Sequence, residues 1–235
     1  MIARLRADIL LRQGLQKIPG SASIDMGLEM MTDAFPNGVF PLGCVHEFIC
    51  TSQEDKTAST GFIAGLLSRL MKRSGACLWI SASQQLFPPA LLAFGIEPER
   101  IVFTTLPREK DQLWVMEEAL KCDSLCAVVG DIRNLDFTAS RRLQLAVEQS
   151  RVTGFLVRQT THTNTTACVS RWRIRSAASV LPEGMPGIGF PRWNVELLKI
   201  RNGKMGSWTL EWKNKRFREI TTAPALVFEQ QKQTG

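Results

Sequence analysis

The chain has 235 residues, of which 44% are hydrophobic, so it can bury one sizeable core, and a single main domain is expected. It contains no apolar run long enough to cross a membrane, and charged residues interrupt the opening stretch, which argues against a secretory signal and predicts a soluble cytoplasmic protein. The six cysteines are scattered through the sequence, several in apolar segments, where we expect free thiols rather than a disulfide framework. The net charge of +7 is concentrated after Arg151, which indicates a surface for a polyanion such as DNA.

The first part of the chain combines one helical pattern with the start of a sheet. Apolar spacing over residues 2–16 predicts an amphipathic helix that ends near Pro19. Further along, turn residues precede an apolar run over 44–50, which is expected to be the first strand. A polar loop is then expected over 51–56, followed by a helix over 57–73.

Strand and helix patterns alternate through the middle of the chain. The expected strands cover 76–81, 101–104, 124–130 and 153–157, and the expected helices cover 88–94, 110–121 and 138–150. Such alternation with short connections is typical of a parallel sheet that helices cover on both faces. The predicted fold class is therefore α/β.

After residue 167 the pattern changes to the alternation of antiparallel strands, which are expected over 168–175, 193–201 and 207–213. The turn Arg201-Asn202-Gly203-Lys204 is the strongest hairpin signal in the chain. These strands are expected to extend the sheet. The predicted organisation is an N-terminal helix and linker (1–34), a core domain (35–218) and a mobile C-terminal tail (219–235).

The last strands also carry the candidates for binding DNA or a protein partner. Side chains two residues apart on a strand share one face, and a row of like charges needs solvent or an acidic partner. The candidate residues are Arg171, Arg173, Arg175, Arg192, Lys199 and Arg201. The tryptophans interleaved with them could stack on bases, but in alternating strands they are expected to fill a core.

Several segments resemble the recombinase RecA and, more specifically, the ImuA family, whose members are RecA-related and are encoded with mutagenic repair polymerases. The segments that carry the likeness are 41–48, the loop ending in Lys56-Thr57, 86–95, and the C-terminal stretches 170–175, 191–199, 201–203 and 206–212. The resemblance covers roughly residues 35–213. It implies a RecA-like fold, with a mostly parallel sheet flanked by helices and antiparallel C-terminal strands.

The nucleotide site that such a fold would carry is degenerate in this sequence. A P-loop has the form G-x-x-x-x-G-K-[ST], because its glycines let backbone N–H groups curl around the phosphates. The aligned stretch runs from Cys50 to Thr57, and only its final residues, Lys56 and Thr57, match. The second glycine position holds Asp55, which we expect to cap the helix with Lys56 as its counter-ion. A carboxylate about 4 Å from a phosphate charge costs about 4 kcal/mol at an effective dielectric constant near 20.

Two further parts of an ATPase site are missing by the same comparison. The strand ending at Val129 is followed by Gly130 where a metal-ordering acid should stand, and Asp131 is expected to face the other way. Ser83 stands where RecA-like ATPases carry the glutamate that activates water. The sequence therefore predicts a protein that is not an enzyme and that needs no cofactor.

No other catalytic or metal site is expected. His46 and His162 cannot be joined to a nucleophile and an acid, so we expect structural or surface histidines. Cys122 and Cys126 lack the further ligands that a zinc site requires.

The resemblance implies a non-catalytic accessory protein of error-prone translesion synthesis in the SOS response. Its implied partners are an ImuB-like relative of Y-family polymerases and an error-prone replicative-type polymerase, contacted through the N-terminal helix, the tail or a RecA-type subunit edge. Contact with RecA, binding of DNA and association of two copies through such an edge stay open. Two alternatives also stay open: an active P-loop ATPase that uses Asp131 or Glu47 as its acid, and a stand-alone DNA-binding module.

Overall fold

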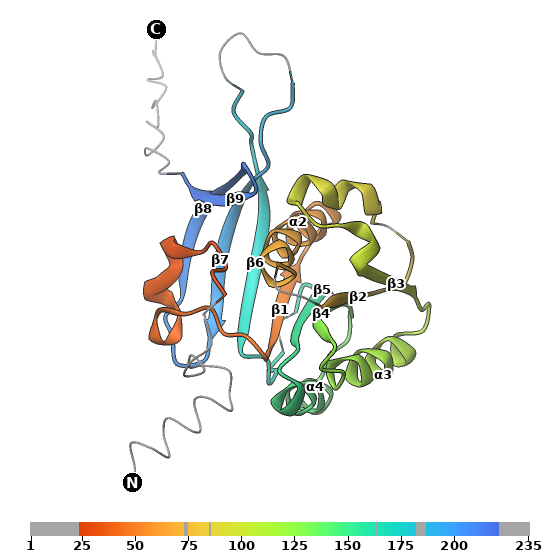
Figure 1. The fold of residues 1–235 in the computed structure, drawn as a ribbon. Helices are drawn as coiled ribbons and strands as arrows, with labels where there is room; N and C mark the ends of the chain where they lie inside the picture. The colour runs from red at the N-terminus through yellow and green to blue at the C-terminus, as the bar shows by residue number, and fades with distance from the viewer. Residues whose placement is uncertain (1–23, 73–74, 85, 163, 182–186, 221–235) are drawn as a thin grey trace, which may run out of the picture.

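The computed structural model describes residues 24–72, 75–84, 86–162, 164–181 and 187–220, which are built around one nine-stranded sheet (Figure 1). The strand order is β3-β2-β4-β5-β1-β6-β7-β8-β9. The strands are β1 (Val45–Cys50), β2 (Ala76–Ser81), β3 (Ile101–Thr105), β4 (Leu125–Asp131), β5 (Thr153–Gln159), β6 (Ser170–Ala177), β7 (Arg192–Ile200), β8 (Gly206–Lys213) and β9 (Arg216–Glu219). The first six strands of this order, from β3 at the edge to β6, pair in parallel. The last three, β7, β8 and β9, each pair antiparallel with the strand before them. The predicted RecA-like α/β fold is confirmed.

Helices cover both faces of the parallel part of the sheet. They are α2 (Gln53–Leu70), α3 (Glu109–Leu120) and α4 (Phe137–Ser150), with short 3-10 helices η1 (Glu29–Ala34), η2 (Pro36–Gly38), η3 (Pro88–Phe94) and η4 (Pro98–Arg100). The larger core lies between α2 and the sheet, and the smaller core lies under α3 and α4. No helix within the described ranges is long and apolar enough to cross a membrane.

The segment before β1 packs onto the sheet as well. Residues 24–34, assigned to a linker from the sequence, include η1, whose Met31 is fully buried. Phe35 and Phe40 then contact Trp172 of β6, with ring centroids 6.2 and 6.3 Å apart. The helix expected over 2–16 and most of the tail lie outside the described residues, so the predicted domain boundaries stay predictions.

The C-terminal strands form the expected antiparallel extension. The turn containing Asn202, with φ of 58°, joins β7 to β8 as predicted. Trp172, Trp193 and Trp212 are buried, so these tryptophans fill a core rather than offering faces to bases. Strand β9 was not predicted; it follows a tight turn in which Asn214 and Lys215 both have positive φ.

A polar network holds the connection between β5 and β6. These two strands lie on either side of β1, and the described residues of the connection between them form no helix. The buried carboxylate of Glu47 on β1 accepts hydrogen bonds from Arg158 of β5 at 2.9 Å and from Arg171 of β6 at 2.8 Å. Its Oε1 also accepts the hydroxyl of Thr166 in the crossover. Because a buried charge is tolerated only when it is paired, this network fixes the register between the two halves of the sheet.

His46 is a core residue, as expected. Its ring stacks between Phe40 and Phe155, at centroid distances of 4.7 and 5.7 Å. Nε2 donates to the carbonyl of Pro41 at 2.9 Å, which leaves Nδ1 to accept the hydroxyl of Ser170 at 2.6 Å. Burial lowers the pKa of His46 to about 4, although the Pro41 hydrogen bond acts in the opposite direction.

This histidine makes stability depend on pH. Above pH 6.5 the imidazole is neutral in both states, but between pH 6.5 and 4 the unfolded chain takes up the proton and the folded protein does not. The contribution to stability is therefore lost as the pH falls, by about 2–3 kcal/mol at pH 4.5. Urea unfolding should show that the free energy of unfolding falls more between pH 7 and pH 4.5 for the natural protein than for His46→Gln. Parallel pH profiles would contradict this account.

Candidate functional site

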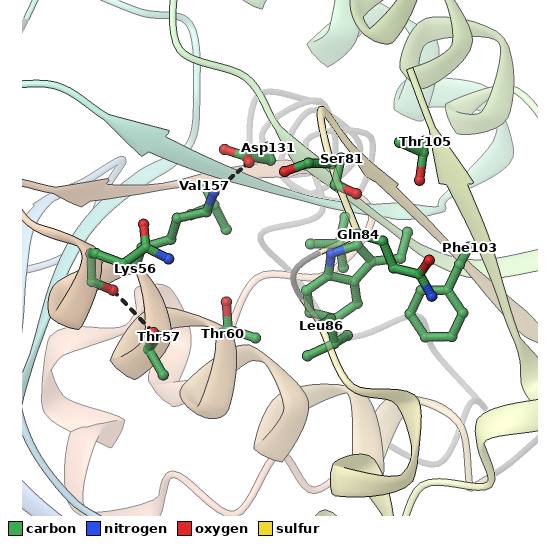
Figure 2. A pocket seen from close by; sticks show the side chains of 14 residues that line it. Lys56, Thr57, Thr60, Ser81, Gln84, Leu86, Phe103, Thr105, Asp131 and Val157 are labelled. Atoms are coloured by element: carbon green, nitrogen blue, oxygen red, sulfur yellow. Dashed lines mark hydrogen bonds and ion pairs between the residues drawn. The ribbon is translucent and has the colours of Figure 1, made fainter. Parts of the chain in front are cut away.

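A cavity of about 250 Å³ lies at the carboxyl ends of the parallel strands, beside the first turns of α2 (Figure 2). This edge is where open α/β sheets usually bind their ligands. Its walls are partly apolar, with Trp79, Phe103 and Val157, and partly polar, with Lys56 and Asp131. The cavity is also lined by Thr57, which remains from the P-loop pattern, and by Ser83, which was predicted to replace the glutamate of an ATPase.

The connection from β1 to α2 is shorter than the sequence predicts. The expected polar loop over 51–56 is wrong, because α2 begins at Gln53 and only Thr51 and Ser52 lie between strand and helix. Ser52 is the N-cap, and its hydroxyl accepts the backbone N–H of Asp55 at 3.1 Å. Residues that would curl around phosphates in a P-loop are here part of a tight turn and a regular helix.

Asp55, predicted to cap the helix, is not the N-cap, but its carboxylate closes the turn from the other side. It accepts the Thr51 backbone N–H at 3.1 Å and the Thr51 hydroxyl at 2.6 Å. Together with Ser52 it satisfies backbone donors that a phosphate would otherwise use. Lys56 was predicted to be the counter-ion of Asp55, but its described ion pair is with another carboxylate, that of Asp131.

Lys56 instead pairs with Asp131, whose carboxylate lies 2.5 Å from Nζ (Figure 2). The prediction that Asp131 faces the other way is also wrong. Strand β4 continues through Asp131, so its side chain shares the α2 face with Ala127 and Val129, while Gly130 faces Met116. Both charged side chains are largely buried, with exposed fractions of 12% and 13%.

The other residues considered for an ATPase site can also be located in the structure. The Thr57 hydroxyl, which would hold a metal in a P-loop, donates to the carbonyl of Gln53 at 3.0 Å. Ser83 lines the cavity at the position predicted for a missing glutamate. Glu47, the other acid considered as a replacement, does not line the cavity, and its carboxylate is bound by Arg158 and Arg171. The described site thus offers an ammonium group that is already neutralised and a helix end that is already capped.

The six basic candidates on the C-terminal strands do not form one unpaired row. Arg171 binds Glu47, and Arg173 and Arg175 both bind Glu196, at 3.3 and 3.1 Å. The remaining three are also engaged, since Arg192 binds Glu211 at 2.9 Å, Lys199 donates to the carbonyl of Thr166 and Arg201 to that of Ala167.

The acidic partner that such a row requires therefore lies within the same chain. Sequence reasoning did not select the exposed Arg216 and Arg218 on β9. Their spacing of two residues directly after the Asn214-Lys215 turn is the signal that could have found them.

Comparison with known proteins gives two related sequences. No protein-family model matches the chain. The chain is 33% identical over 201 residues to "Protein ImuA" of Caulobacter vibrioides strain NA1000 / CB15N. The matched region covers 80% of this chain and 82% of that protein. "Protein ImuA" of the strain ATCC 19089 / CIP 103742 / CB 15 matches with the same identity and coverage.

The Lys56–Asp131 pair can be measured as a coupling energy. Lys56→Met, Asp131→Asn and the double variant should form a cycle in urea unfolding with a coupling of about 1–3 kcal/mol, because the two charges are poorly hydrated. The exposed pair of Lys121 and Glu118, at 2.7 Å, is the matched control and should give at most about 0.5 kcal/mol. A coupling near zero for Lys56 and Asp131 would mean that the pair does not stabilise the folded protein.

Proposed function

Because this chain belongs to the ImuA family, we propose that it is a non-catalytic accessory protein of the DNA damage and mutagenesis system, which acts by docking onto partner proteins. The family membership supports the place of the protein in mutagenesis. The state of the cavity supports the view that nucleotide hydrolysis is not part of its role.

The observation that carries this proposal is the closed turn between β1 and α2. A triphosphate seated there would have to displace Ser52 and Asp55 from backbone donors and separate Lys56 from Asp131. It would also place phosphate charge near the Asp55 carboxylate, at a cost of about 4 kcal/mol for a separation of 4 Å. This cost corresponds to nearly a thousandfold loss of affinity.

The proposed partners are those implied by the family, an ImuB-like polymerase relative and an error-prone replicative-type polymerase. Large apolar side chains that remain exposed offer docking points of the kind that protein interfaces use. Among them are Phe87, Trp114 and Ile188, with exposed fractions of 69%, 63% and 90%. Truncation of residues 1–20 or 219–235, followed by capture of partners from damaged cells, would show which end of the chain contributes.

A second candidate function, an ATPase with altered motifs, has one observation in its favour. Asp131 does face Lys56 across the cavity, so an acid stands near the position where a metal would be ordered. The two candidates differ in whether ATP can open the Lys56–Asp131 pair and the capped turn.

Nucleotide titration distinguishes them. We expect the purified protein to show no saturable ATP binding below about 1 mM, with or without Mg²⁺, and no hydrolysis above background, because the phosphate position is capped. Calorimetry and a phosphate-release assay would measure both. Lys56→Ala should leave damage-induced mutagenesis unchanged in cells. Micromolar ATP binding that Lys56→Ala abolishes would overturn the proposal and favour the ATPase.

A further inference from the structure

The antiparallel strands carry a flat polar face that is separate from the cavity. Along β7, β8 and β9, buried and exposed residues alternate, and the apolar side chains of Val195, Leu210 and Phe217 all lie on the α2 side. The opposite side carries the basic face, which we define by Arg173, Arg175, Arg192, Lys213, Arg216 and Arg218. Within the described residues, α3 and α4 pack under the parallel strands and not under these.

The cations of the basic face outnumber its carboxylates. Glu196 is shared by Arg173 and Arg175, and Glu211 is bound by Arg192. On the edge strand β9, Arg216 and Arg218 are exposed and make no ion pair with any described residue. In the β8–β9 register Arg216 stands opposite Lys213, and Arg218 stands opposite Glu211, whose carboxylate is bound by Arg192. Two arginines with no carboxylate partner therefore stand together at the rim of a face that is already positive.

The composition of the face distinguishes nucleic acid from protein as its partner. Protein interfaces are built around a buried core of aromatic and aliphatic side chains. Between the cations this face instead presents Asn194, Ser207 and Thr209. Nucleic-acid interfaces are polar, positively charged and hydrated, and arginine recognises phosphate through two parallel hydrogen bonds.

The face also indicates how a nucleic acid would be read. Trp193 and Trp212 of these strands are buried on the other side, so they offer no surface on which bases could stack. Phe190 lies at the margin, where its ring is covered by the Lys213 ammonium group at 4.8 Å. Contacts would therefore go to phosphates, which position a nucleic acid without reading its sequence.

We propose that the basic face binds the phosphate backbone of DNA without sequence preference, with Arg216 and Arg218 as its main contacts. The two guanidinium groups leave the same side of β9 from residues about 6.6 Å apart along the strand, so they can engage separate phosphates. This inference goes beyond the proposed docking role and does not depend on the state of the nucleotide cavity.

The test compares two double variants that remove the same charge. Arg216→Gln with Arg218→Gln changes the basic face, whereas Arg108→Gln with Lys110→Gln removes two exposed cations at the start of α3, near the opposite edge of the sheet. Fluorescence anisotropy with a labelled 30-nucleotide strand and with the matching duplex would measure binding from about 50 to 200 mM salt. These two probes also show whether single- or double-stranded DNA is preferred.

We expect the full chain to bind at least one of these probes and the β9 variant to bind about tenfold or more weakly at 50 mM salt. The slope of log affinity against log salt should become shallower by about 2, because two phosphate contacts are lost. The affinity of the control variant for DNA should stay within about twofold of that of the natural protein. An unchanged circular dichroism spectrum and melting temperature would show that the β9 variant is folded, and Arg175→Gln provides a second, independent test of the face.

Three results would overturn the proposal. The first is that the natural protein binds neither probe. The second is an equal loss of DNA affinity in both double variants, which would reflect net charge alone. The third is that the β9 variant loses affinity for poly-glutamate without any change in DNA binding. The last result would identify an acidic protein segment as the partner. None of these results bears on ATP binding, so this inference can fail while the proposed accessory role stands.

Discussion

The short turn between β1 and α2 sets the structure of the edge at which a RecA-like fold would hold a nucleotide. With only Thr51 and Ser52 between strand and helix, the chain has no loop that could surround phosphates. The helix end is capped by side chains of the same turn, and the first turns of α2 carry Lys56 onto Asp131. One short connection thus fills, with its own side chains, the position at which a P-loop holds phosphates.

Several charged side chains of the sheet are likewise paired with residues far away in the sequence. Glu47 binds arginines from β5 and β6, and Glu196 of β7 binds two arginines of β6. The outer strand β9 differs from β6 and β7 in this respect. Arg216 and Arg218 extend from the edge strand without a carboxylate, and this contrast separates charge used for folding from charge presented to solvent.

The alternation of strands and helices could be predicted from the sequence because it depends on local periodicity and turn residues. The start of α2 could not, because the alignment with a P-loop outweighed the capping pattern formed by Ser52 and Asp55, which was visible in the sequence. The orientation of Asp131 depends on how far β4 continues, which local pattern does not define. The pairing of Arg171 with Glu47 joins residues 124 positions apart, and no spacing rule reaches that distance.

The position of β1 has a consequence for incomplete chains. β1 lies between β5 and β6, and every one of its residues is buried, yet β6 is made more than a hundred residues later. A chain that stops before β6 exposes the hydrogen-bonding edge of an apolar strand and leaves Glu47 without Arg171. A chain that ends before Ser170 is therefore prone to self-association and is not a smaller working domain.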